Sequence, residues 1–250
     1  MFIAVLTDIA KLMLIAAGFF FGLGVYVRNT RPLWSEPLQK RRLVVASLIV
    51  LAVLILDVTE DTIGGDSGPI DRAILQFVHR HVPGMLHDFF AAVTLTGSWA
   101  ALVPLTILAT LVLALMKHRR EALLLFASLT TSALMIYVIK VSVDRDRPAL
   151  WATDLYWGSS FPSGHTLIVA SFATAASLCV NRIRPAMHGY AVAISLIWVF
   201  LVALSRLIIG VHWPTDVLAA ACIGAFIPLA LSLALAIREP GKVSATGRGL

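Results

Sequence analysis

Seven apolar segments, most of them close to the length needed to cross a lipid bilayer, constrain the fold of this chain more than any other feature. A membrane-spanning helix needs about 20 predominantly apolar residues, because each residue adds only ~1.5 Å of rise. The composition agrees, since the sequence is 59% hydrophobic and only 14% charged, whereas soluble domains are about a quarter charged. The sequence therefore predicts an all-α, polytopic membrane helix bundle. The predicted spans are residues 12–27, 43–58, 91–116, 122–140, 165–180, 189–207 and 216–237.

The first apolar segment, residues 12–27, resembles the apolar part of a signal peptide. No small-residue cleavage site follows it, and the next residues are strongly basic. We therefore expect a retained anchor whose N-terminus lies outside. The segment is short for a span, so the helix is expected to begin nearer Leu6. Gly18 and Gly22 form a GxxxG pattern, which favours close helix packing and identifies a candidate dimer face.

The distribution of basic residues predicts the orientation of the spans, because cytoplasmic loops carry an excess of Lys and Arg. With the N-terminus outside, most of the 20 Lys and Arg residues fall in the expected inner loops. The net charge of +6 therefore reflects membrane orientation and does not indicate a nucleic-acid partner. Residues 238–250 are expected to form a basic cytoplasmic tail. The inner basic residues are Arg28, Arg31, Lys40, Arg41, Arg42, Lys117, Arg119, Arg120, Arg182, Arg184, Arg238, Lys242 and Arg248.

The segment that follows the second span is expected to lie outside the membrane. Residues 59–69 are acidic and glycine-rich, which is typical of a loop. Ile70, Ile74, Phe77 and Val78 then recur at helical spacing and predict a short helix in the membrane interface. The histidines nearby indicate a solvated face rather than a metal site, because spacing alone does not define one. The polar residues expected on this surface are Asp71, Arg72, His79, Arg80, His81 and His87.

Three polar motifs interrupt the apolar sequence at the ends of predicted spans. The third reads Ser205-Arg206, five residues, His212, three residues, and Asp216. Pro214 disfavours helix at the residue before it and suits the first turn of a helix, so His212 is expected in a turn beside Asp216. A carboxylate on one ring nitrogen leaves the other nitrogen available for nucleophilic attack. The alternative is a capping aspartate beside an interfacial histidine.

The second motif is Pro162-Ser163-Gly164-His165, at the start of the fifth span. Ser163 is a suitable N-cap, and Gly164 allows close approach of the backbone to a ligand. The N–H groups and the dipole at a helix start bind anions. His165 could then donate a proton to a leaving oxygen. The alternative is an ordinary capped helix start.

The first motif is Lys140, six residues, and Arg147 followed by a proline. Arg147 offers a planar fork for two phosphate oxygens, and Lys140 supplies a point charge. Both residues could instead extend their cationic ends toward water from the membrane boundary. Arg145 is expected either to contact phosphate or to pair with Asp144 or Asp146.

The three motifs, placed at one membrane depth, form the arrangement expected for phosphoryl transfer through a histidine. Written as K-x6-R-P, P-S-G-H and S-R-x5-H-x3-D, they resemble the signature motifs of the type 2 phosphatidic acid phosphatase family over roughly residues 60–237. The resemblance implies a six-span phosphatase domain in residues 43–237, to which residues 1–42 add an extra span and a basic inner loop. It implies that His212 is the nucleophile, that Asp216 orients it, and that His165 is the leaving-group acid. It also implies that no metal is needed and that phosphate is held by Lys140, Arg147, Ser163, Gly164 and Arg206.

The resemblance implies an integral membrane lipid phosphatase that hydrolyses a lipid phosphomonoester or diphosphate at the outer leaflet through a phosphohistidine. We expect a bacterial inner membrane location, an active site on the periplasmic face, a phosphorylated lipid as substrate, and no cofactor. The alternatives are a lipid phosphotransferase and a non-catalytic transporter that binds lipid headgroups. Aromatic residues in the outer loop 149–161 could flank the lipid's path to the site or form an ordinary interfacial belt. They are Trp151, Tyr156, Trp157 and Phe161.

Overall fold

The computed structural model describes residues 2–65, 67–149 and 158–237 of the 250-residue chain. All regular structure in these ranges is helical, which confirms the predicted all-α class. The elements are α1 (Phe2–Thr30), α2 (Pro32–Lys40), α3 (Arg42–Gly64), α4 (Gly68–His81), α5 (Met85–Thr96), α6 (Trp99–Leu115), α7 (Arg119–Ser142), α8 (Gly164–Ile183), η1 (Pro185–Met187), α9 (His188–Ile208) and α10 (Pro214–Ile237).

Within the described ranges, six helical stretches are long and apolar enough to cross a membrane. They are α1, α3, α7, α8, the η1–α9 stretch and α10. The pair α5 and α6 makes a seventh span if its two bent halves are counted together. The membrane helix bundle is therefore confirmed, with the third predicted span divided in two.

The prediction of one helix over residues 91–116 is wrong, because α5 and α6 meet at a 42° bend around Gly97 and Ser98. A Cβ atom on Gly97 would lie 2.8 Å from Val202 Cγ1, so the absence of a side chain lets the bend approach α9 closely. Ser98 then starts a new helix, since its Oγ accepts the backbone N–H of Ala101 at 3.3 Å. Serine is a favoured N-cap for this reason.

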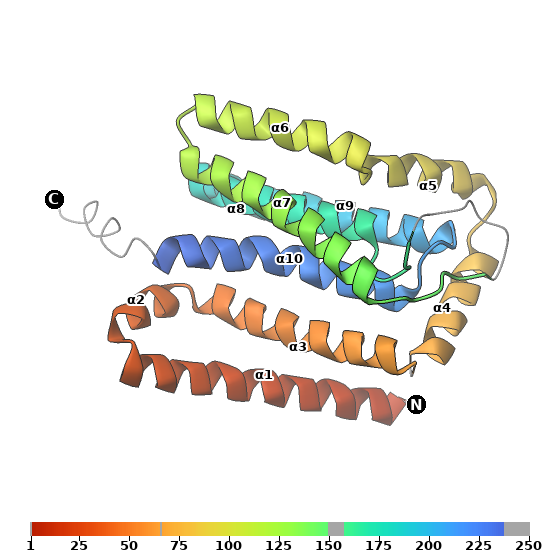
Figure 1. The fold of residues 1–250 in the computed structure, drawn as a ribbon, viewed down its shortest axis with the longest axis horizontal. Helices are drawn as coiled ribbons and strands as arrows, with labels where there is room; N and C mark the ends of the chain where they lie inside the picture. Colours follow the sequence, from red (N-terminus) through yellow and green to blue (C-terminus); the bar gives the residue numbers. More distant parts are fainter. Residues whose placement is uncertain (1, 66, 150–157, 238–250) are drawn as a thin grey trace.

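Helix α8 forms the centre of the bundle, packed against α7, α9 and α10 (Figure 1). Leu167, Ile168 and Val169 on α8 are fully buried, and they join a core to which α6, α7, α9 and α10 all contribute. By contrast, α1 lies at the edge of the bundle and packs mainly on α3. Its face at Gly18 and Gly22 is open, with nothing within 4 Å of an added Cβ at either glycine. The dimer face predicted there stays a prediction.

Helix α4 runs across one end of the bundle, as Figure 1 shows, and matches the predicted interfacial helix. Ile70 and Phe77 are more than half exposed, whereas Leu75 is fully buried. The expectation that Asp71 lies on the surface is wrong, because its side chain is also fully buried. Asp71 and Leu75 are four residues apart and therefore share the inward face of the helix.

The two ends of the bundle differ in character (Figure 1). The site end carries α4, the start of α1, the last turns of α7 and α9, and the first turns of α8 and α10. The opposite end carries α2, the α6–α7 connection and the η1 turn, where many of the predicted inner basic residues lie. The predicted basic tail, 238–250, and the loop aromatics at 151, 156 and 157 fall outside the described residues.

Candidate active site

The turn that carries His212 is produced by the way α9 ends. Gly210 adopts φ +80°, a left-handed conformation that favours glycine. Its N–H bonds to the carbonyl of Leu207 at 3.0 Å, and the N–H of Val211 bonds to the carbonyl of Arg206 at 3.2 Å. This pair of bonds defines a Schellman motif, which satisfies the last carbonyls of a helix. The chain therefore leaves α9 after Ile208, within one turn of Arg206, and places His212 in the turn before α10.

Helix α10 begins at Pro214, as the sequence predicts. Asp216 lies in its first turn, and its Oδ2 accepts the backbone N–H of Trp213 at 2.8 Å. His212 Nδ1 lies 3.5 Å from the same oxygen, which is longer than an ordinary N–H···O bond. His212 is 3% exposed and Asp216 is fully buried. The predicted neighbours are thus brought together within the protein.

The second motif lies against the third. Ser163 occupies the N-cap position of α8, but its Oγ lies 3.1 Å from Thr166 Oγ1 and makes no capping bond to the backbone. The backbone N–H of Ser163 donates instead to the carbonyl of Asp216 at 3.1 Å. His165 is half-buried in the first turn of α8, where Arg206 and His212 act on it electrostatically.

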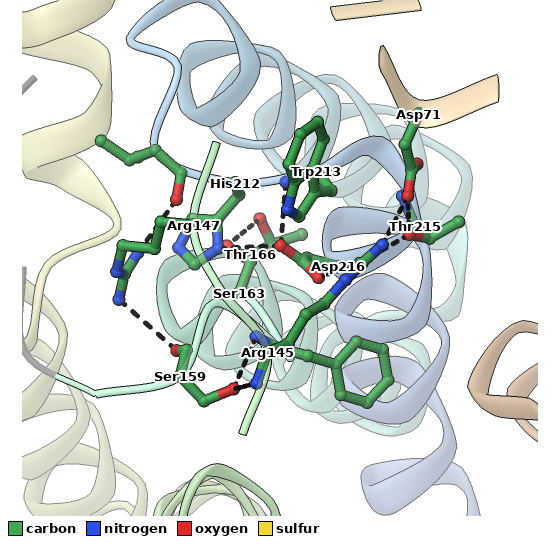
Figure 2. A network of polar contacts seen from close by, with 12 residues as sticks. Asp71, Arg145, Arg147, Ser159, Ser163, Thr166, His212, Trp213, Thr215 and Asp216 are labelled. Atoms are coloured by element: carbon green, nitrogen blue, oxygen red, sulfur yellow. Dashed lines mark hydrogen bonds and ion pairs between the residues drawn. The ribbon is translucent and has the colours of Figure 1, made fainter. Parts of the chain in front are cut away.

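The first motif closes the site through the chain that precedes α8. Lys140, at the end of α7, donates from Nζ to the carbonyl of Ser159. Arg147 Nη2 lies 3.5 Å from that carbonyl, and its Nη1 donates to the carbonyl of Val211 at 2.9 Å. Figure 2 shows Arg147 between Ser159 and the turn that carries His212. All three motifs therefore converge on His212.

Arg206 reaches the same region from α9 and is almost completely buried. Its Nη1 donates to Thr94 Oγ1 on α5 at 2.7 Å. A buried arginine is costly unless its N–H groups find acceptors. The α5 half of the bent span therefore helps to hold a predicted phosphate ligand, and Thr94 was not foreseen from the sequence.

The predicted pairing of Arg145 with Asp144 or Asp146 is wrong, because Arg145 bridges two carboxylates from distant elements. Its Nη1 donates to Asp216 Oδ1 at 2.5 Å, and its Nη2 donates to Asp71 Oδ2 at 2.7 Å. The structure thus pairs it with neither of the adjacent aspartates. Asp71 was missed as a site residue, because its i, i+4 spacing with Leu75 marks an inward position only once Leu75 is known to be buried.

Burial favours the neutral form of His212. Burial holds the pKa of His212 down at about 4, and the nearby Arg206 and Arg147 act in the same direction. Asp216 opposes this lowering but does not overcome it. A neutral imidazole is the form that can act as a nucleophile. Among the described residues, no group of three or more His, Cys, Asp or Glu side chains is gathered as metal ligands would be.

The fold and the site define a class: a polytopic helix-bundle membrane protein with a buried histidine–aspartate pair among cations at one end. Residues 121–238 match the family model described as "PAP2 superfamily". The matched segment contains all three motifs, and over this segment the chain is similar to that family.

Similar proteins show where the resemblance lies. The chain is 40% identical over 84 residues to phosphatidylglycerophosphatase B of Escherichia coli (strain K12), covering 33% of this chain and 32% of that protein. It is 24% identical over 203 residues to undecaprenyl-diphosphatase of Sulfolobus acidocaldarius, covering 78% of this chain and 92% of that protein. The match thus spans only about a third of the length of the Escherichia coli relative.

A solved structure shows the same fold. The PAP2-type phosphatidylglycerolphosphate phosphatase of Bacillus subtilis superposes with a TM-score of 0.69 at 22% identity, covering 74% of this chain and 94% of that one. At this identity the likeness concerns the fold alone. It supports the helix arrangement that brings the three motifs together.

Proposed function

We propose that this protein is an integral membrane phosphatase that hydrolyses a lipid phosphomonoester or diphosphate through a phosphohistidine intermediate. The observation that carries the proposal is the convergence of three sequence-distant motifs on one buried histidine. His212 lies 3.5 Å from Asp216, and Arg147 bonds to the residue just before His212. The names of the relatives, which include a lipid phosphatase and a lipid diphosphatase, support the same substrate class.

In the first step, Nε2 of His212 attacks the phosphorus atom and the bond to the lipid oxygen breaks. Asp216 faces Nδ1 and favours the tautomer whose lone pair is on Nε2. His165 donates a proton to the departing oxygen. In the second step, His165 accepts a proton from water, which attacks the phosphorus and releases His212 and free phosphate.

The developing negative charge is stabilised by Lys140, Arg147 and Arg206. Arginine presents planar donor pairs that suit phosphate oxygens. Ser163 and the backbone of Gly164 add the positive end of α8. Electrostatic stabilisation of this kind supplies much of the catalysis of phosphoryl transfer. We propose on this basis that hydrolysis needs no metal and continues in the presence of a chelator.

We further propose that the site end faces the periplasm and that the substrate is taken from the outer leaflet of a bacterial inner membrane. The support is the concentration of predicted inner basic residues at the opposite end. Helix α4, with Ile70 and Phe77 exposed, would then lie at the headgroup level of the outer leaflet. The proposed division into an added N-terminal span, residues 1–42, and a phosphatase domain, residues 43–237, follows from the edge position of α1.

The test is phosphate release by the purified protein in detergent micelles with a chelator present. The substrates are phosphatidate, phosphatidylglycerophosphate, a lipid A phosphate and a polyprenyl diphosphate. We expect release from at least one substrate and none from the His212→Ala variant. Transfer of the phosphoryl group to an added lipid without free phosphate would identify a phosphotransferase. Movement of labelled lipid between leaflets without any phosphate release would identify a transporter and contradict the proposal.

A further inference from the structure

We propose that Asp71, on the interfacial helix α4, is a positioning residue that sets the orientation of Asp216 through Arg145. This inference rests on the proposed function, because it assigns Asp71 to the same reaction. Asp71 belongs to none of the three motifs, and it lies 145 residues from Asp216 in the sequence. Its role follows from the contacts of its two carboxylate oxygens.

Both oxygens of Asp71 are fully engaged at the start of α10. Oδ1 accepts the backbone N–H of Thr215 at 3.0 Å. Oδ2 accepts the hydroxyl of Thr215 at 2.6 Å and Nη2 of Arg145 at 2.7 Å. The side chain of Asp71 is fully buried. A buried carboxylate persists only when it is paired and hydrogen-bonded, and here both conditions hold.

The contact with Thr215 explains why α10 can begin where it does. The residue before Pro214 is Trp213, whose side chain has no oxygen with which to cap the first N–H groups of the helix. Asp71 supplies the missing acceptor from another helix by binding the N–H of Thr215. Its negative charge also suits the positive end of the helix dipole. Asp71 therefore fixes the first turn of α10, which contains Asp216.

The contact with Arg145 fixes the carboxylate of Asp216 itself. Arg145 uses Nη2 for Asp71 and Nη1 for Asp216, so its planar fork ties the two acids together. Oδ1 of Asp216 is held by Arg145, and Oδ2 is held by the N–H of Trp213. These two bonds leave Oδ2 facing Nδ1 of His212. Figure 2 shows the succession Asp71, Arg145, Asp216 and His212 across the site.

The charge of Asp71 has a specific consequence for the arginine. Arg145 serves two carboxylates and also donates to the hydroxyls of Thr215 at 2.9 Å and Ser67 at 3.3 Å. Without the Asp71 charge, only these neutral hydroxyls would oppose a turn of the guanidinium onto Asp216 alone. A bidentate pair of that kind engages both carboxylate oxygens. Oδ2 would then be withdrawn from His212, and the imidazole would lose the group that selects its tautomer. Asp71 thus acts on the rate of the chemical step more than on substrate binding.

The experiment compares Asp71→Asn with wild type in the full-length protein. Asparagine keeps the shape and an oxygen for the N–H of Thr215 but removes the charge that holds Arg145. We expect kcat to fall about 10–100-fold, the range found when groups that orient metal-bound histidines are removed, while KM changes less than about threefold. The matched control is Glu60→Gln. Glu60 is an exposed acidic residue near the C-terminal end of α3, so its substitution should leave kcat and KM unchanged.

A double-mutant cycle tests whether Asp71 acts through Arg145. In an Arg145→Gln background, which is itself slow, adding Asp71→Asn should lower kcat by less than about twofold, because the link is already cut. If the losses of kcat caused by Asp71→Asn and Arg145→Gln instead multiply in the double variant, the two residues act independently. That result would overturn the proposal that Asp71 acts through Arg145. Equal kcat for wild type and Asp71→Asn would overturn the inference altogether.

A purely structural role must also be distinguishable. Each variant is therefore purified by size-exclusion chromatography, and kcat is calculated per mole of the monodisperse protein. The melting temperature is measured on the same sample. A per-mole kcat equal to wild type, with only a lower yield or melting temperature, would show that Asp71 serves folding alone and overturn the inference. Absence of phosphatase activity in the wild-type protein on every substrate would instead reject the proposed function.

Discussion

Substitution of Gly224 by alanine tests the contact between α8 and α10 on which the site depends. An added Cβ would lie 2.4 Å from the carbonyl oxygen of Leu167, 2.7 Å from Ala170 Cβ and 3.1 Å from the N of Ser171. The first contact is about 1 Å shorter than an ordinary van der Waals contact, which begins near 3.4 Å. Two of these atoms belong to the α8 backbone, so no side-chain rotation relieves the clash. The two helices must therefore move apart.

The expected size of the effect follows from this geometry. Overpacking of a well-packed core costs about 1–3 kcal/mol. For a protein of this size, that loss lowers the melting temperature by roughly 2–12 °C. Separation of α8 from α10 also lengthens the 3.1 Å bond from Ser163 N–H to the carbonyl of Asp216. Gly224→Ala should therefore lose activity as well as stability, even at temperatures where it stays folded.

The assay is a thermal melt in detergent together with phosphate release at 25 °C. Gly189→Ala in α9 is the control, because nothing lies within 4 Å of its added Cβ. Alanine is the better helix former, so this control should be neutral or slightly stabilising. A Gly224→Ala protein with the melting temperature and activity of wild type would refute the packing argument.

Three further predictions concern the chemistry and the orientation. Because burial holds the pKa of His212 at about 4, its nitrogen-15 NMR signals should titrate near pH 4. The nucleophile would then be neutral above that pH and protonated below it, and titration near the ordinary pH 6.5 would contradict the site. His165→Ala should slow hydrolysis of an alkyl phosphate far more than hydrolysis of an aryl phosphate, whose leaving group needs little protonation. Equal losses of rate on the two substrates would indicate that His165 serves binding. A membrane-impermeant thiol reagent on intact cells should label Glu60→Cys but not Asn181→Cys, in a background without native cysteines, and the reverse pattern would place the site end in the cytoplasm.

The spans and motifs were predictable because their signals are local. Apolar length identified the membrane helices, and Pro214 correctly indicated that α10 begins directly after the turn with His212. The spacing of Ile70, Ile74 and Phe77 correctly indicated helix α4. These features depend on residues close together in the sequence, so no knowledge of the fold was needed.

The remaining features depend on contacts between distant residues. The break at Gly97 follows from close packing on Val202 in α9, which a hydropathy pattern does not reveal. Arg145 has aspartates on both sides in the sequence, yet it pairs with Asp71 and Asp216, which lie more than 70 residues away in either direction. The sequence alone favours pairing of Arg145 with the aspartates next to it. The fold instead brings the buried carboxylates of Asp71 and Asp216 to its guanidinium.

The central claim is that His212 becomes covalently phosphorylated during turnover. The direct measurement is to mix the protein with a lipid substrate carrying a radiolabelled phosphate, quench in alkaline detergent, and locate the label by peptide mass spectrometry. Phosphohistidine is stable in base and labile in acid, so the label should survive the quench and be lost on acidification.

We expect the label on His212, formed at least as fast as the steady-state turnover. It should be absent from His212→Ala, whose turnover should fall by at least roughly 1,000-fold. In His165→Ala the label should accumulate, provided that an aryl phosphate substrate supplies a good leaving group, because water then lacks its base in the second step. A label on another residue, or near-normal turnover by His212→Ala, would contradict the account.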